Sequence, residues 1–300
     1  MNESKVDFAV KRTRKLDPLE NAMQLLFFLC GAVAVAFVLV ITVYLVVSGL
    51  PAIQKVGLGN FLLGTTWDSA NKTDPQYGIL PFILTSIYGT AGAILIGVPV
   101  GFMMAMFLAK AAPPKLAAVV RPAVDLLAGI PSVVYGMVGM VVLLPGIRGL
   151  FHLKAGDTLL AAILVLAVMI LPSIISVSET ALRSVPREYE EASLALGATE
   201  METYFRVSAP AAKSGIAAAV VLGVGRAIGE AMAIMMVAGN AANMPGLFKS
   251  VKFLTTAVAS EMAYSSGLQR QALFSIALVL FIFIMLINIA LNTLLKRKKG

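Results

Sequence analysis

The chain has 300 residues, of which 59% are hydrophobic and 13% are charged, and its formal net charge at pH 7 is +8. A soluble domain usually carries about a quarter charged residues, so this composition excludes an ordinary soluble domain and predicts a membrane protein. The positive charges flank apolar segments, as membrane topology requires, and nucleic acid is therefore not an expected partner.

Six apolar runs are each long enough to cross a bilayer, because a hydrocarbon core of about 30 Å needs about 20 helical residues. We therefore expect an all-α polytopic membrane protein with six transmembrane helices. The runs cover roughly residues 22–48, 79–109, 123–145, 158–182, 214–240 and 271–295.

Lysine and arginine are distributed unequally between the two sides of these runs. One side carries sixteen, including the N-terminal arm and the C-terminal tail, and the other side carries seven. The positive-inside rule then predicts that both termini are cytoplasmic. We divide the chain into a polar arm (1–21), a transmembrane domain (22–295) and a basic tail (296–300).

Proline and glycine occur inside three of the runs, in Gly97–Gly101, Gly129–Ser132 and Leu171–Ser173. Proline in a spanning helix bends the axis, and glycine lets neighbouring helices approach closely. Broken helices are common in transporters, although both residues are also frequent in membrane helices in general.

Arg226 and Glu230 lie four residues apart within the fifth run, so in a continuous helix they share one face. Counting from the start of that run places Arg226 about 18 Å into the bilayer. A charged group there costs about 2.5–3.5 kcal/mol or more, so it needs a reason. A guanidinium suits phosphate or carboxylate, which favours an anion pathway lined by Arg226 with Glu230 orienting it. The alternative is that Arg226 and Glu230 pair with each other and only hold the transmembrane helices together.

Two further pairs have the same spacing near the inner ends of the third and fourth runs. They are Arg121 with Asp125, and Glu179 with Arg183. Because these positions are shallow enough for the side chains to reach water, we expect gating or structural ion pairs there rather than solute binding.

Nothing in the sequence supports catalysis or a bound cofactor. There is no Walker A sequence, no Gly-x-Ser-x-Gly and no cluster of histidine and cysteine. We therefore expect that the chain is not an enzyme, and that any energy from ATP comes from another protein.

The segment 184–213, between the fourth and fifth runs, is too long and too charged for a simple turn. It contains Glu191-Ala192-Ser193, then Gly197, then Val207-x-Ala209-Pro210. This pattern resembles the EAA loop of bacterial ABC importer permeases. Glu191, Ala192, Gly197 and Pro210 match that motif at the family spacing, whereas Ser193, Val207 and Ala209 depart from it mildly. In that family the segment is a pair of short helices that dock on the ATPase subunit.

Two other stretches are similar to phosphate permeases, of the PstC type more than the PstA type. They are residues 126–136 and the segment from Arg226 to Asn240, with support from Tyr77–Pro81. The resemblance covers roughly residues 75–295. It implies the fold of a type I ABC importer permease in a bacterial inner membrane, with Arg226 contacting phosphate in transit.

The resemblance also implies a set of partners. They are a PstA-type sister permease, two PstB-type ATPase subunits that use ATP and Mg²⁺, a PstS-type phosphate-binding protein and the surrounding lipid. Three alternatives stay open: an importer of another oxyanion such as sulfate or molybdate, an ion-coupled secondary transporter, and a membrane scaffold or sensor. The EAA loop argues against the secondary transporter, which has no ATPase to dock.

Overall fold

The computed structural model describes residues 18–69, 71 and 73–297. Most of the predicted N-terminal arm, and residues 298–300 of the predicted tail, lie outside the described residues. By their internal contacts the residues of the chain form two compact units, Met1–Val46 and Val47–Gly300. The first unit holds most of helix α1 (Pro18–Val56).

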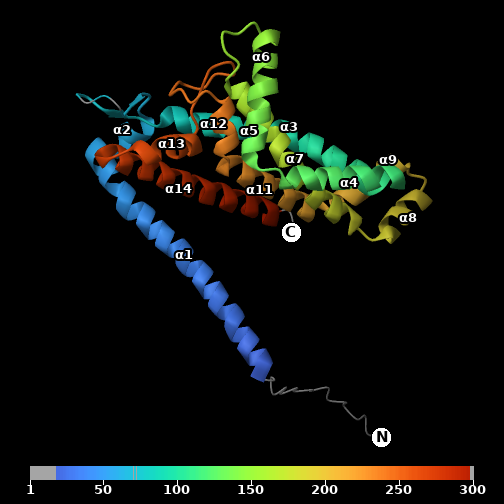
Figure 1. Cartoon of the computed structure of the whole chain (residues 1–300). Helices are drawn as coiled ribbons and strands as arrows, with labels where there is room; N and C mark the ends of the chain where they lie inside the picture. The colour runs from blue at the N-terminus through green and yellow to red at the C-terminus, as the bar shows by residue number, and fades with distance from the viewer. Residues whose placement is uncertain (1–17, 70, 72, 298–300) are drawn as a thin grey trace. The chain divides into compact units, whose positions relative to one another are not determined.

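The described chain is mostly helical, as predicted (Figure 1). The longer helices after α1 are α3 (Leu80–Met106), α4 (Pro114–Gly129), α7 (Leu159–Arg183), α11 (Lys213–Gly229) and α14 (Gly267–Arg297). The shorter α-helices are α2 (Leu58–Leu63), α5 (Ser132–Val138), α6 (Leu144–Leu150), α8 (Arg187–Ala195), α9 (Glu200–Thr203), α10 (Ala209–Ala211), α12 (Met232–Val237) and α13 (Leu254–Glu261).

Three π-helices and one 3₁₀-helix join these elements. The π-helices are η1 (Phe107–Ala111), η2 (Gly139–Leu143) and η3 (Tyr204–Ser208), and the 3₁₀-helix is η4 (Met262–Tyr264). The sequence did not indicate the one small sheet, in which β1 (Trp67–Asp68) pairs antiparallel with β2 (Gln76–Tyr77).

Among the described residues, five helical segments are long and apolar enough to cross a membrane. A sixth is reached only if Glu200–Ala211 and Lys213–Gly229, which are bent by 73° from each other, count as one span. The five segments are Glu20–Val56, Leu80–Ala111, Ser132–Leu150, Leu159–Arg183 and Gly267–Ala290. We name the ends of these segments inner and outer according to the distribution of lysine and arginine.

The third apolar run is not the single helix predicted for 123–145. Helix α4 ends at Gly129, Ile130 is extended (φ −67°, ψ 128°), and α5 begins after Pro131. A residue before proline is sterically disfavoured in the helical region, which explains the break at Ile130. The third candidate span is therefore Ser132–Leu150, and α4 with its charged residues is a separate helix before it.

Helices α3 and α7 lie side by side (Figure 1) because α3 presents glycines to isoleucines of α7. A Cβ added at Gly97 would lie 2.7 Å from Ile170 Cδ1, and one at Gly101 would lie 2.8 Å from Ile174 Cγ2. The predicted close approach through this Gly-x-x-x-Gly pattern is confirmed, and Pro99 between them does not interrupt the helix.

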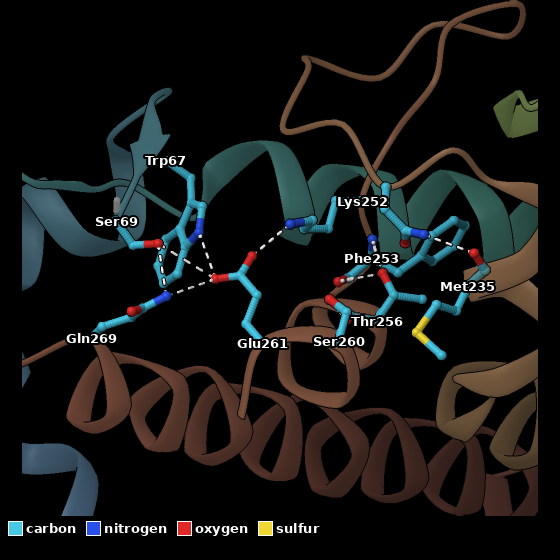
Figure 2. Close-up of polar contacts among 10 residues, drawn as sticks. Trp67, Ser69, Met235, Lys252, Phe253, Thr256, Ser260, Glu261 and Gln269 are labelled. Atoms are coloured by element: carbon cyan, nitrogen blue, oxygen red, sulfur yellow. Dashed lines mark hydrogen bonds and ion pairs between the residues drawn. The ribbon is translucent and has the colours of Figure 1, made fainter. Parts of the chain in front are cut away.

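A polar network fixes the outer end of the Val47–Gly300 unit (Figure 2). The carboxylate of Glu261 accepts hydrogen bonds from Lys252 Nζ (2.6 Å), Trp67 Nε1 (3.3 Å), Gln269 Nε2 (3.3 Å) and Ser69 Oγ (3.5 Å). Trp67 and Ser69 lie between α2 and α3, Lys252 lies between α12 and α13, and Gln269 belongs to α14; the first two segments are the outer loops. The network therefore holds the outer loops in one arrangement around a single partly buried acid.

Candidate functional site

The fifth apolar run is broken next to its arginine. Helix α11 ends at Gly229, Glu230 is extended (φ −72°, ψ 132°), and α12 begins at Met232. The prediction that Arg226 and Glu230 share a continuous helix face is therefore wrong. The two side chains form no ion pair in the part of the chain that the structure describes.

Glu230 stabilises the break instead of neutralising the arginine. Its Oε1 accepts a hydrogen bond of 2.9 Å from the backbone N–H of Ala233, in the first turn of α12. Its carbonyl oxygen accepts a hydrogen bond of 2.7 Å from Thr255 Oγ1. A carboxylate at the start of α12 satisfies an amide that has no partner within the helix.

Arg226 is half-buried in the last turn of α11. Its Nη1 donates to Ser173 Oγ of α7 at 3.3 Å. Among the described residues, no carboxylate is paired with it. In the sequence, Leu171–Ser173 is notable only for its proline. The contact of Ser173 with Arg226 was therefore not predicted.

The three glycines around Arg226 differ in what surrounds them. Gly223 faces Ile174, since an added Cβ would lie 3.1 Å from that side chain, and it serves the packing of α11 on α7. An added Cβ at Gly225 or Gly229 would meet nothing within 4 Å. Open space beside Arg226 therefore exists at two of the three glycines, and a cation with open neighbours is suited to receive an anion.

The four residues of the shallow ion pairs lie around one cavity of about 370 Å³ at the inner end of α7. Glu179 and Arg183 form the predicted pair, with 2.8 Å between Nε and Oε1. Arg121 does not pair with Asp125, because its Nε lies 2.6 Å from the same oxygen of Glu179. Asp125 is exposed and has no ion pair in the described structure. The cluster is thus two arginines sharing one buried carboxylate.

The segment 184–213 forms short helices joined by a tight turn. Glu191 and Ala192 are exposed on α8, and Pro210 is exposed in α10. Gly197 has a φ of +89°, a left-handed conformation that residues with a Cβ rarely adopt, and this glycine makes the turn between α8 and α9. Thr199 then starts α9 with a capping box that includes Glu202.

The departure from the family pattern at Ser193 has a structural reason. Its Oγ lies 2.9 Å from Thr203 Oγ1, so the hydroxyl joins α8 to the end of α9. Beside this contact, Leu196 is 90% exposed, and the side chains of Tyr189, Leu194 and Met201 are also exposed. An apolar surface of this kind on a polar loop is typical of a contact with another protein.

Comparisons with known sequences show the family. Residues 97–300 match the model of binding-protein-dependent transport system inner membrane components. The probable ABC transporter permease protein YqgH of Bacillus subtilis is 37% identical, covering 96% of this chain and 94% of the relative. The phosphate transport system permease protein PstC of Haemophilus influenzae is 34% identical, covering 100% and 97%.

The fold is also that of solved ABC importers. A chain from the inward-facing MetNI methionine ABC transporter superposes with a TM-score of 0.54 at 22% identity, covering 73% of this chain and 94% of the other. At that identity the likeness shows the fold alone. Together, the helices and the matches show that this chain belongs to the binding-protein-dependent transport system inner membrane components, as an ABC importer permease with PstC permeases among its relatives.

Proposed function

We propose that this inner-membrane permease is the PstC-type subunit of an ATP-driven importer of inorganic phosphate. The observation that carries the proposal is Arg226, a half-buried cation beside a helix break, with no carboxylate partner in the described structure and with open space at Gly225 and Gly229. Relatives that are named phosphate transport system permeases match 90–100% of this chain, which supports phosphate as the anion.

The cost of burying a cation explains why an anion is the natural cargo. No carboxylate forms an ion pair with Arg226 among the described residues, so the positive charge of its guanidinium is uncompensated and most of its donors are unused. An oxyanion that enters the space beside it both neutralises that charge and accepts a fork of hydrogen bonds. Because the carboxylate of Glu230 accepts a hydrogen bond from the backbone of α12, it is not paired with the arginine in place of the anion.

In the proposed assembly this chain forms the pathway with a PstA-type sister permease. A PstS-type binding protein delivers phosphate from outside, and two PstB-type ATPase subunits bind and hydrolyse ATP with Mg²⁺. The loop 184–213 docks on one ATPase through the surface around Glu191, Ala192, Gly197 and Pro210. The exposed apolar side chains of that loop, above all Leu196, support a protein partner there.

Uptake measurements in cells that lack this chain test the substrate. We expect loss of high-affinity phosphate uptake with sulfate and molybdate uptake unchanged, and restoration by the wild-type chain. The opposite pattern, in which sulfate uptake is lost and phosphate uptake persists, would show that the chain serves a different oxyanion.

A further inference from the structure

The π-helix η1 at the inner end of α3 contacts the loop 184–213 on one side and the Arg121–Glu179–Arg183 cluster on the other. Both sets of contacts are made by a stretch of five residues, Phe107–Ala111. In the sequence, Lys110 is only one of the sixteen basic residues assigned to the inner side.

The backbone of η1 leaves one buried carbonyl without a helical partner. The N–H of Ala112, which would reach Leu108 in an α-helix, donates instead to Phe107 at 2.7 Å. The next residue is Pro113, which has no N–H. Because Leu108 is only 2% exposed, its carbonyl oxygen requires a partner from elsewhere.

Two arginines from other helices supply that partner. Arg121 Nη2 donates to the Leu108 carbonyl at 3.1 Å, and Arg183 Nη2 donates to it at 2.9 Å. Each guanidinium also donates through Nε to the same oxygen of Glu179, at 2.6 Å and 2.8 Å. The inner ends of α3, α4 and α7 are therefore fixed to one another through a single carbonyl and a single carboxylate.

The other side of η1 binds the loop. Lys110 Nζ lies 2.5 Å from Glu190 Oε1 of α8, and these side chains are 11% and 17% exposed. Ser208 Oγ of η3 donates to the same carboxylate oxygen at 2.6 Å, and Tyr204 donates its hydroxyl hydrogen to the Lys110 carbonyl at 3.3 Å. Both arms of the loop are thus attached to η1 by partly buried polar contacts.

We propose that η1 transmits movement of the loop 184–213 to the inner ends of α3, α4 and α7, with Lys110 and Glu190 as the positioning residues of ATP-driven transport. This inference rests on the proposed function, in which an ATPase moves that loop. Separating a partly buried ion pair leaves an uncompensated charge, so displacement of α8 pulls η1 with it. The π-turn can shift because side chains from other helices, rather than its own backbone, hold the Leu108 carbonyl.

The test uses the complete transporter reconstituted in vesicles with its sister permease, ATPase and binding protein. Phosphate taken up per ATP hydrolysed is measured for Lys110→Met, for Glu190→Gln, and for the exchanged pair Lys110→Glu with Glu190→Lys. Exposed Lys115 at the start of α4 supplies the matched control, Lys115→Met. The ratio is informative because uptake and hydrolysis both scale with the amount of folded complex, so a loss of folded protein alone leaves it unchanged.

We expect each single variant to keep its ATPase bound while the ratio falls about tenfold, within the range typical of coupling between separate sites. The exchanged pair should return the ratio to within about twofold of wild type, and Lys115→Met should match wild type. Unchanged ratios in both single variants would overturn the proposal. So would loss of the ATPase from those variants, which would make the pair part of the docking surface. A wild-type complex that binds no ATPase would instead contradict the proposed function itself.

Discussion

The guanidinium of Arg226 and the hydroxyl of Ser173 connect α11 to α7 at the break in the fifth apolar run, with 3.3 Å between Nη1 and Oγ. This contact orients the arginine without neutralising it, since a hydroxyl carries no charge. Among the described residues Arg226 has no other hydrogen bond, so its remaining donors are available for a solute, which is the arrangement that anion transfer requires.

Removing the hydroxyl tests whether this orientation matters. In Ser173→Ala we expect the maximal phosphate uptake rate to fall by about three- to tenfold, because a typical intramolecular hydrogen bond contributes about 1 kcal/mol. The rate is measured with labelled phosphate in vesicles containing equal amounts of assembled complex. Ser214→Ala, an exposed serine at the start of α11, serves as the control. Equal rates in both variants would show that Ser173 does not orient Arg226 for transport.

Glycine-to-alanine substitutions test the packing of α3 on α7. Gly97→Ala places a methyl group 2.7 Å from Ile170 Cδ1, so we expect it to destabilise the complex by about 1–3 kcal/mol. At Gly149 of α6 an added Cβ meets nothing within 4 Å, and Gly149→Ala should be neutral or stabilising by about 0.5–1 kcal/mol. Thermal unfolding in detergent measures both. A Gly97→Ala variant as stable as Gly149→Ala would mean that the helices can separate without cost.

Two acids at the inner end of the bundle should respond differently to neutralisation. Glu179 is buried and neutralises both Arg121 and Arg183, so Glu179→Gln leaves two cations facing each other. Because both arginines are partly exposed, we discount the cost of a fully buried broken pair and expect about 1–3 kcal/mol. Asp125→Asn should change stability by less than about 0.5 kcal/mol, because Asp125 is exposed. Similar unfolding midpoints for the two variants would contradict the shared role of Glu179.

The turn at Gly197 offers a test of the loop's shape. Its φ of +89° is strained for a β-branched residue, whereas asparagine tolerates the left-handed region. We expect Gly197→Val to reduce the ATPase that copurifies with the permease, and Gly197→Asn to retain most of it. Full retention in Gly197→Val would show that this turn is not needed for docking.

Helix content, membrane insertion and the family could be predicted because each depends on properties spread over many residues. The break at Ile130 was harder to place, although the following Pro131 provides a local steric reason. The break at Glu230 has no proline beside it, and it depends on Ala233 and Thr255, whose contacts arise only in the folded chain.

The ion pairs also show how little residue spacing alone can predict about contacts between helices. Four-residue spacing correctly predicted Glu179 with Arg183 but not Arg121 with Asp125, because Glu179 comes from a different helix and is more deeply buried. The attachment of Lys110 to Glu190 joins residues 80 positions apart, and no pattern within either segment indicates it. Contacts of this kind arise from tertiary packing. The periodic patterns of a single sequence therefore do not predict them.

Labelled-phosphate uptake by the assembled transporter carrying Arg226→Ala, with excess sulfate as competitor, tests the central claim most directly. The account predicts that the wild type takes up phosphate regardless of sulfate. It also predicts that the variant assembles with its ATPase yet loses about 100-fold or more of the uptake rate, as expected when a group that stabilises charge in transit is removed. Wild-type levels of phosphate uptake in an assembled Arg226→Ala complex would contradict it.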